Sequence, residues 1–273
     1  MTTTVSIQGF EGSFHQIAAQ QFFGKEITVL PCSRFTEVIA NTQAGDSSAS
    51  VMAIENSIAG SILPNYNLLQ KSSLKIVGEV YLPIKQHLLV NPGVTLSDIR
   101  EVHSHPMAIQ QCLDYLLQHN WKLVETDDTA LSAKHIHQHK SKHIAGIAGK
   151  LAAELFHLHI LAPDIHTENS NYTRFLVLQT EEKLIADANK ASLSFQTDHA
   201  IGSLSKVLSH IAGAKINLSK LQSFPIPGSN WKYNFHADLE FDTIEQFNNT
   251  VEEIKAMTKA LKIFGVYKNA KQQ

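Results

Sequence analysis

The chain has 273 residues, of which 43% are hydrophobic, enough apolar side chains to build two or three domain cores. A formal net charge of −2 without any basic run gives no electrostatic basis for binding nucleic acid. Two cysteines, Cys32 and Cys112, are too few for a disulfide framework. No apolar run approaches the roughly 20 residues that span a bilayer, and the N-terminus lacks the pattern of a signal peptide. These features predict a cytoplasmic protein with no membrane partner.

Short apolar runs with strand character alternate with helical patterns over about the first 180 residues. Strands are predicted at 5–7, 26–30, 50–54, 76–81, 85–90, 99–102, 122–125 and 143–148. Helical periodicity follows the first two strands, and Pro106 and Thr129 mark two further helix starts. This alternation predicts parallel or mixed sheets with helices on both faces. Ligands of such sheets bind where strands end, and several polar clusters stand at those points.

The pattern changes after about residue 180. A polar stretch at 183–190 indicates a linker between a first domain at 1–182 and a second at 191–273. The second domain predicts strand, helix, strand, strand, helix, strand at 191–196, 202–212, 215–226, 231–241, 243–261 and 263–267, with a turn at 227–230. That βαββαβ order is the ferredoxin-like fold. Such a domain serves either as a dimerisation module or as a ligand sensor.

Three polar clusters are candidates for a binding site. The segment 9–15 has two glycines three residues apart, so that its backbone can approach an anion, and Ser13 can cap the following helix. Glu55-Asn56-Ser57 follows an apolar strand, where a carboxyl becomes a general acid if burial raises its pKa. For both clusters a plain turn and helix cap remains an alternative.

The third cluster is the segment Asn171-Tyr172-Thr173-Arg174-Phe175, which leads directly into an apolar strand. A guanidinium is a planar, permanently charged group that suits a carboxylate. A hydroxyl beside it can donate to a substrate oxygen. The combination predicts a site for an anionic substrate.

The fifteen histidines do not form a recognisable metal motif. His135, His137, His139 and His143 are close in sequence, but no carboxylate lies among them and no His-Glu-x-x-His is present. We therefore predict exposed histidines at a helix end, no metal site, and no cysteine nucleophile.

Together these clusters resemble the prephenate dehydratase family over nearly the whole chain. The matching segments are Ser6–Phe14 (with Phe10 where proline is common), Ala53–Gly60 (with Ala53 for proline), Ser104-His105-Pro106, Asp128-Thr129-Ala130 and Asn171–Phe175. The resemblance implies a bilobal α/β catalytic domain similar to type II periplasmic binding proteins, with the active site between its lobes. It implies conversion of prephenate to phenylpyruvate by a carbon–oxygen lyase without a cofactor.

The resemblance also implies roles for individual residues. Thr173 is the expected proton donor, with Glu55 as the alternative donor. The expected substrate ligands are Ser13, Asn56, Ser57, Thr129, Asn171, Arg174 and Phe175.

The C-terminal domain resembles an ACT domain, the phenylalanine sensor of this family. The expected effector ligands are Gly202, Ser203, Leu204, Asn217, Leu218, Gln222 and Ser223. Gln222 and Phe224 replace the usual glutamate and arginine, which leaves the strength of feedback inhibition open. Pairing through this domain predicts a homodimer or homotetramer.

Two alternatives remain open at this point. Arogenate dehydratase differs only in binding an amino group instead of a keto group. A non-catalytic bilobal amino-acid sensor would explain the same fold, although not the presence of both Glu55-Asn56-Ser57 and Thr173-Arg174.

Overall fold

The computed structural model describes residues 2–183, 185–226, 228 and 232–270. Its contacts divide the chain into two compact units. Unit 1 comprises Met1–Ser61 and Val80–Phe175, and unit 2 comprises Ile62–Glu79 and Leu176–Gln273. Strands β5 (Lys75–Pro83) and β11 (Tyr172–Gln179) each begin in one unit and end in the other. No helix in the described part of the chain is long and apolar enough to span a membrane.

The first sheet has the strand order β2-β1-β3-β11-β5, with the short β4 paired to β3. Its N-terminal strands are β1 (Thr3–Gln8), β2 (Ile27–Cys32), β3 (Ala49–Asn56) and β4 (Gly60–Ser61). β1 runs parallel to both β2 and β3, as expected when helices connect the strands. These helices are α1 (Phe14–Phe23) and α2 (Phe35–Ala44). The arrangement confirms the predicted βαβ character of this region.

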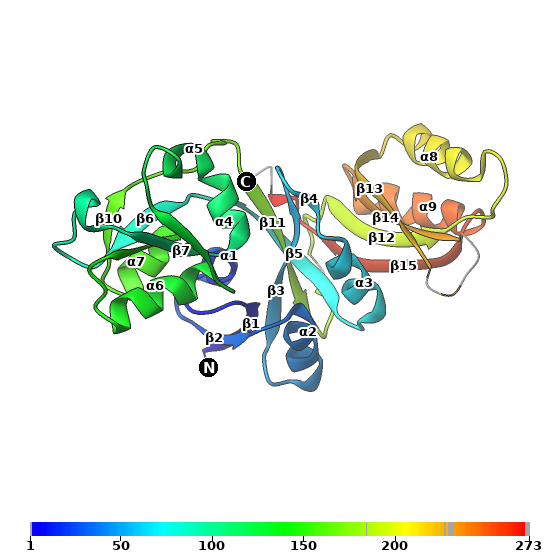
Figure 1. Ribbon diagram of the computed structural model, residues 1–273. Helices are drawn as coiled ribbons and strands as arrows, with labels where there is room; N and C mark the ends of the chain where they lie inside the picture. Colours follow the sequence, from blue (N-terminus) through cyan, green and yellow to red (C-terminus); the bar gives the residue numbers. More distant parts are fainter. Residues whose placement is uncertain (1, 184, 227, 229–231, 271–273) are drawn as a thin grey trace. The chain divides into compact units, whose positions relative to one another are not determined.

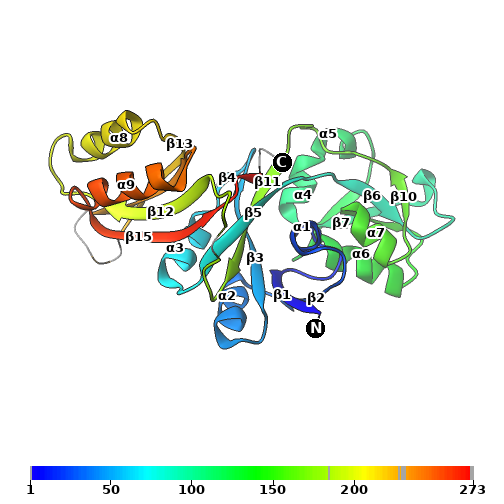
Figure 2. The ribbon, with the colours of Figure 1, turned by 180° about the vertical axis from the view of Figure 1, so that it is seen from behind.

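The second sheet lies wholly in unit 1 and has the order β10-β6-β9-β7-β8. Its strands are β6 (His87–Val90), β7 (Glu101–Ser104), β8 (Lys122–Glu125), β9 (Ile144–Ala148) and β10 (His159–Ala162). α4 (Pro106–Gln111) and α5 (Leu113–Leu116) lie on one side of it, while α6 (Thr129–Gln138) and α7 (Lys150–Leu155) lie on the other (Figure 1, and from behind in Figure 2). A short 3-10 helix, η1 (Leu96–Asp98), precedes β7.

Side-chain alternation in this second sheet gives it two apolar faces. Leu88 and Val90 belong to the cluster that packs α4 and α5. Leu89, between them, belongs to the cluster that packs α6 and α7. A strand buried on both faces reads as a continuous apolar run.

Unit 2 contains the predicted βαββαβ fold. Its elements are β12 (Lys190–Gln196), α8 (Ser203–Gly213), β13 (Asn217–Pro225), β14 (Tyr233–Glu240), α9 (Ile244–Lys255) and β15 (Lys259–Tyr267). The antiparallel order β13-β14-β12-β15 confirms the ferredoxin-like prediction. Leu193 and Phe195 of β12 pack into the core with α8 and α9. The even-numbered side chains of β12 face the opposite way, where α3 (Leu63–Lys71) and β5 contribute partners.

The sequence prediction differs from the structure in several places. The helix predicted over 243–261 is wrong at its end, because α9 stops at Lys255 and β15 begins at Lys259. Pairing of Lys259 with Gln196 on β12 places these residues in the sheet, which overrides local helix propensity. The sequence reading contained neither α3 nor β10. The predicted turn at 227–230 lies mostly outside the described residues.

The compact units do not follow the boundary predicted at residue 182. The contacts group the segment Ile62–Glu79 with the C-terminal part of the chain. The predicted linker also ends one residue earlier than expected, since Lys190 already belongs to β12.

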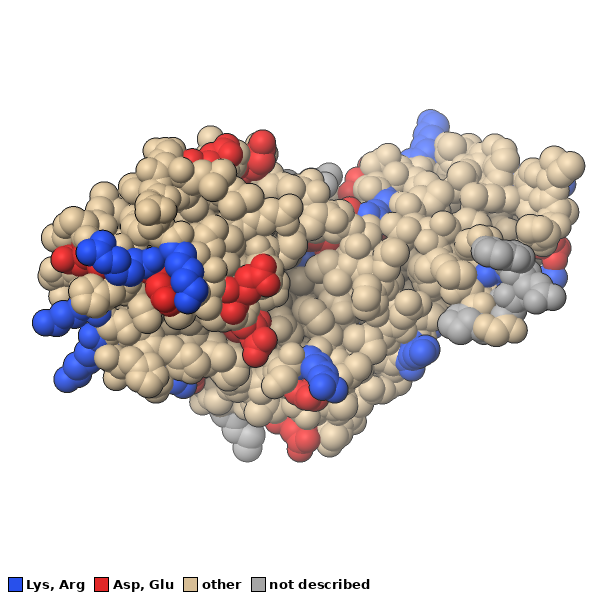
Figure 3. Space-filling view, in the orientation of Figure 1, with Lys and Arg blue, Asp and Glu red and all other residues tan. Residues whose placement is uncertain are grey.

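Charged side chains of both signs are interspersed on the face drawn in Figure 3, and no broad basic patch stands out there. This distribution fits the near-neutral net charge of the sequence.

Candidate active site

The ends of β3 and β11 bring together three of the predicted site residues. The Asn56 Nδ2 atom lies 2.7 Å from Asn171 Oδ1, 3.1 Å from the Tyr172 carbonyl oxygen and 3.0 Å from Thr173 Oγ1. Asn171 and Thr173 are only 2% and 8% exposed. Residues 115 to 117 positions apart in sequence therefore form one buried polar cluster, the Asn56 cluster.

The hydrogen bonds to Asn56 Oδ1 fix the orientation of the Asn56 side-chain amide. The backbone N–H groups of Ile58 and Ala59 donate to Asn56 Oδ1 at 3.0 and 2.9 Å, so this atom must be the oxygen. The opposite atom is then an NH₂ group, which only donates. Thr173 Oγ1 consequently accepts at this contact, so its own proton is not used in the bond to Asn56.

Asn171 is a second donor in the same cluster. Its Oδ1 accepts from Asn56, and its backbone carbonyl accepts from the Ile84 N–H at 2.8 Å. Its Nδ2 is buried and has no hydrogen-bond partner within the described part of the chain. A buried donor left in this state costs free energy, which a ligand oxygen would recover.

Ser57 connects the same two strand ends. Its hydroxyl donates to the Ser170 carbonyl at 2.8 Å and accepts from the Tyr172 N–H at 2.9 Å. The Ser57 N–H also donates to the Tyr172 carbonyl. Ser57 thus holds the loop before β11 in place.

Strand geometry directs two of the predicted residues, Glu55 and Arg174, away from the Asn56 cluster. Successive side chains of a strand point to opposite faces, so Arg174 faces away from Thr173 on β11 and Glu55 faces away from Asn56 on β3. The Arg174 guanidinium carbon lies 5.9 Å from the centre of the Tyr81 ring, within the range of a cation–π contact. Arg174 is only 4% exposed.

The loop between β1 and α1 lies beside the N-terminus of α6, and the first turn of α1 packs against β11. Ser13 caps α1 by accepting from the Gln16 N–H at 3.4 Å. The ring of His15 packs edge-on against Phe175, with the centroids 4.9 Å apart. On the other side, Gly9 has a φ of +89°, which favours glycine, and a Cβ atom added there would lie 2.6 Å from Asp128 Oδ2.

Asp128 places Thr129 at the start of α6. Its Oδ1 accepts from the Leu131 N–H at 2.8 Å, which is an N-cap. Burial is the largest influence on this carboxyl and raises its pKa. Thr129, the predicted ligand, is therefore held at the helix terminus beside the Gly9 loop.

His15 and Asp128 were not among the predicted site residues. Burial lowers the pKa of His15 to about 3, so its imidazole is neutral at physiological pH. Its Nε2 is buried without a hydrogen-bond partner in the residues that the structure describes. Asp128 lies inside a segment that carried the resemblance, and His15 directly follows another, Ser6–Phe14. Their position in the sequence was the available signal.

The histidine-rich segment lies away from the Asn56 cluster. His135 and His139 line a hollow of about 200 Å³ together with His103. The Nε2 of His103 lies 2.8 Å from Glu101 Oε2. Among the described residues, no group of three His, Cys, Asp or Glu side chains could hold a metal ion.

The predicted effector residues fall into two groups in unit 2. Gly202, Ser203 and Leu204 begin α8 and line a hollow of about 460 Å³. The others lie along β13, where Asn217 Nδ2 donates to Glu240 Oε2 at 2.9 Å and Gln222 Nε2 donates to the Ser223 carbonyl at 2.9 Å. Leu218, next to Asn217, packs against the domain core.

Known proteins resemble this chain over almost its full length. The family model described as prephenate dehydratase matches residues 5–183. A bifunctional chorismate mutase/prephenate dehydratase of Enterobacter agglomerans is 31% identical, over 96% of this chain and 70% of the relative. Arogenate dehydratase 2 of Petunia hybrida is 33% identical, over 96% of this chain and 71% of the relative.

Two solved structures share the fold. A structure described as GqqA, a novel type of quorum quenching acylases, has a TM-score of 0.89 and 29% identity, with 99% of this chain and 100% of the other covered. Prephenate dehydratase from Arthrobacter aurescens in complex with L-Phe has a TM-score of 0.88 and 27% identity, with 99% and 91% covered. They confirm the predicted fold class, a bilobal binding-protein-like domain with a ferredoxin-like domain. The sequence match and the shared fold lead to one assignment: the chain belongs to the prephenate dehydratase family.

Proposed function

We propose that the protein converts prephenate to phenylpyruvate by decarboxylating dehydration. One observation carries the assignment of the catalytic group: Asn56 Nδ2 donates to Thr173 Oγ1, which leaves the threonine proton available for a substrate oxygen. The substrate loses one carboxylate as carbon dioxide. Its ring carbon–oxygen bond breaks, and the hydroxyl leaves with the electron pair of that bond and takes up one proton to become water. The electron pair of the broken carbon–carbon bond enters the ring, which becomes aromatic. No electron is gained or lost overall.

Thr173 is the residue that assists departure of the hydroxyl. A hydroxyl side chain is a poor acid in water, so donation of its proton to the leaving oxygen depends on a fixed position beside the atom on which charge develops. Asn56 holds the threonine oxygen, and this restriction orients the O–H bond before the substrate arrives. Glu55 remains the alternative donor, although it points away from the Asn56 side of β3.

The carboxylates of the substrate need donors. Asn171 Nδ2 is a buried donor beside Thr173, and we assign it to a substrate oxygen. Arg174 is the cationic candidate for a carboxylate. Ser13, Ser57, Thr129 and Phe175 complete the proposed binding site.

We also propose that phenylalanine regulates the enzyme through the βαββαβ domain, acting as an ACT domain. The complex of the Arthrobacter aurescens relative with L-Phe supports this proposal. The hollow at the start of α8 is the place where Gly202, Ser203 and Leu204 would contact the effector. β13 is an edge strand and Ile201 is fully exposed, both of which favour pairing of two such domains in a homodimer or homotetramer. We expect the enzyme to act in the cytoplasm.

Two other activities have support from relatives. The Petunia relative makes arogenate a second candidate substrate. The acylase description of one structural relative raises amide hydrolysis. Hydrolysis of that kind uses a nucleophile beside a base. The Ser57 hydroxyl instead donates to a backbone carbonyl, and this contact does not activate it as a nucleophile.

The test is incubation of the purified protein with prephenate, arogenate or an N-acyl amine. The expected result is phenylpyruvate from prephenate, and slower turnover when phenylalanine is added. Phenylalanine formed faster from arogenate would change the substrate assignment. Hydrolysis of the N-acyl amine without turnover of either cyclohexadienol would refute the dehydratase proposal.

A further inference from the structure

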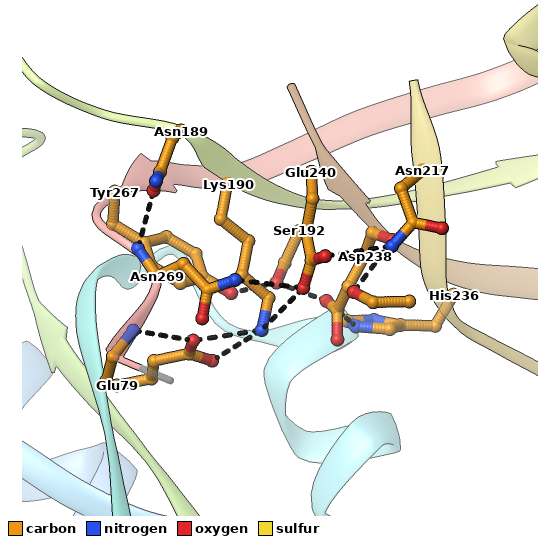
Figure 4. A network of polar contacts seen from close by, with 12 residues as sticks. Glu79, Asn189, Lys190, Ser192, Asn217, His236, Asp238, Glu240, Tyr267 and Asn269 are labelled. Atoms are coloured by element: carbon orange, nitrogen blue, oxygen red, sulfur yellow. Dashed lines mark hydrogen bonds and ion pairs between the residues drawn. The ribbon is translucent and has the colours of Figure 1, made fainter. Parts of the chain in front are cut away.

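A lysine and a glutamate form a fully buried ion pair in unit 2. Lys190 Nζ lies 2.9 and 3.0 Å from the two carboxylate oxygens of Glu79 (Figure 4). Their side chains are 1% and 0% exposed. Lysine and glutamate are almost never buried to this extent, because desolvation of both charges is costly. A pair kept in this position therefore suggests a role other than stability.

The ion pair continues into a polar network that reaches β13. Lys190 Nζ lies 4.0 Å from Glu240 Oε1, and Asn269 Nδ2 donates to the same oxygen at 2.9 Å. The second oxygen of Glu240 accepts from Asn217 Nδ2 (Figure 4). Asn217 is one of the effector ligands predicted from the sequence. One carboxylate thus connects a proposed effector ligand with the buried lysine.

At its other end the pair is anchored on β5, which leads to the proposed catalytic residues. Glu79 is the last residue of unit 2 on this strand, and Tyr81, two positions further, has its side chain on the same face. Tyr81 contacts Arg174, the neighbour of Thr173 on β11, and β11 is the strand next to β5. Just beyond β5, the Ile84 N–H holds the Asn171 carbonyl.

We propose that Lys190 and Glu79 are positioning residues that couple effector binding at Asn217 to the alignment of Thr173 through β5. An effector that takes the Asn217 amide from Glu240 leaves a carboxylate oxygen seeking another donor, and Lys190 is the nearest cation of this network. Movement of the ammonium toward Glu240 weakens its hold on Glu79. β5 then shifts, and Tyr81, a residue of this strand, shifts with it. This inference rests on the proposed regulation by phenylalanine.

The same strand of the domain supplies a matched control. Ser194 lies on the same face of β12 as Lys190, but its hydroxyl donates to Gln70 Oε1 on α3 at 2.8 Å. It therefore contacts a helix that does not enter the proposed active site. Ser194→Ala should leave the coupling intact.

The experiment uses the full chain with the double variant Glu79→Gln/Lys190→Met. The two substitutions remove both charges together and keep the side chains similar in size, which avoids an isolated buried charge. Phenylalanine binding is measured by calorimetry and prephenate turnover with and without phenylalanine. Binding and turnover without effector should stay within about threefold of the unmodified chain. The effector should change turnover by a factor near 1, against the roughly 5- to 150-fold typical of allosteric coupling.

Several results would overturn the proposal. A folded double variant that phenylalanine still inhibits as strongly as the unmodified chain would refute the proposed coupling through Lys190 and Glu79, called the relay below. The proposed regulation by phenylalanine would stand. Loss of phenylalanine binding in that variant would make the pair part of the binding site instead. Absence of any phenylalanine response in the unmodified chain would remove the proposed regulation, and the relay with it.

A second measurement decides the matter if the double variant does not fold. Hydrogen exchange of the β5 amides in the unmodified chain should change when phenylalanine is added, and Lys190→Arg, which keeps the charge, should retain inhibition. Unchanged exchange in β5 under saturating phenylalanine would contradict the relay.

Discussion

Replacement of Thr173 by valine removes the proposed donor and changes little else. The Asn56 NH₂ group has two hydrogens and three acceptors, namely Asn171 Oδ1, the Tyr172 carbonyl and Thr173 Oγ1. In Thr173→Val the first two acceptors remain, at 2.7 and 3.1 Å, so no buried donor is left unpaired. The expected cost in the free energy of unfolding is one net hydrogen bond, about 1 kcal/mol.

The expected loss of activity is much larger. A positioned proton donor contributes about 10²- to 10⁴-fold in rate, which corresponds to roughly 3 to 5 kcal/mol of transition-state stabilisation. The assay is the rate of phenylpyruvate formation, with unfolding in urea measured in parallel. Thr173→Ser restores a hydroxyl at the same position and should recover much of the rate. Turnover of Thr173→Val within a few-fold of the unmodified enzyme would refute the role of Thr173.

Three further predictions concern stability. The pKa of His15 falls from 6.5 to about 3 on folding, so the folded state binds fewer protons than the unfolded state and loses about 1.4 kcal/mol of stability per pH unit between about pH 6.5 and pH 3. His15→Phe should remove this part of the dependence of the unfolding free energy on pH, measured in urea, and parallel profiles for the two proteins would contradict it. Gly265→Ala would place a Cβ atom 2.0 Å from the Ile76 carbonyl oxygen and should destabilise the protein by several kcal/mol in thermal unfolding. The control, Gly213→Ala, lies in open space at the end of α8 and should be neutral or stabilising by up to about 1 kcal/mol, and equal effects of the two substitutions would refute the steric argument. Asn56→Ala leaves the Ile58 and Ala59 N–H groups without their acceptor, so it should lower the free energy of unfolding by about 2 to 4 kcal/mol and should also lower turnover. A variant that loses stability but keeps full turnover would show that Asn56 has no role in catalysis.

Much of the candidate site follows from local sequence. Asn56 stands at a strand end, and a polar residue there before Gly60 indicates a turn. Ser13 and Asp128 both cap helices, as their position before a helical pattern indicates. What the sequence did not indicate is which of these side chains meet. The contact between Asn56 and Thr173 joins residues 117 positions apart, and it depends on the placement of β11 beside β3.

The role of Lys190 could not be predicted from its neighbours in sequence. It ends a polar stretch that has the composition of an exposed linker. In the structure it is the first residue of β12 and is buried against Glu79, a residue of the N-terminal half. Charged residues are expected at the surface because desolvation is costly, and only a partner brought by the fold reverses that expectation.

The sequence by itself determined most of the elements of the first domain, the βαββαβ order of the second and the segments that carry the proposed chemistry, because periodicity, caps and turns are local properties. Tertiary structure alone decided which face each side chain occupies and which distant groups pair. Thr173 and Arg174 are adjacent in sequence, yet the pleat of β11 directs one toward Asn56 and the other toward Tyr81. Pairing of strands from distant parts of the chain selects those partners, since a buried polar group must find its hydrogen bonds within the fold.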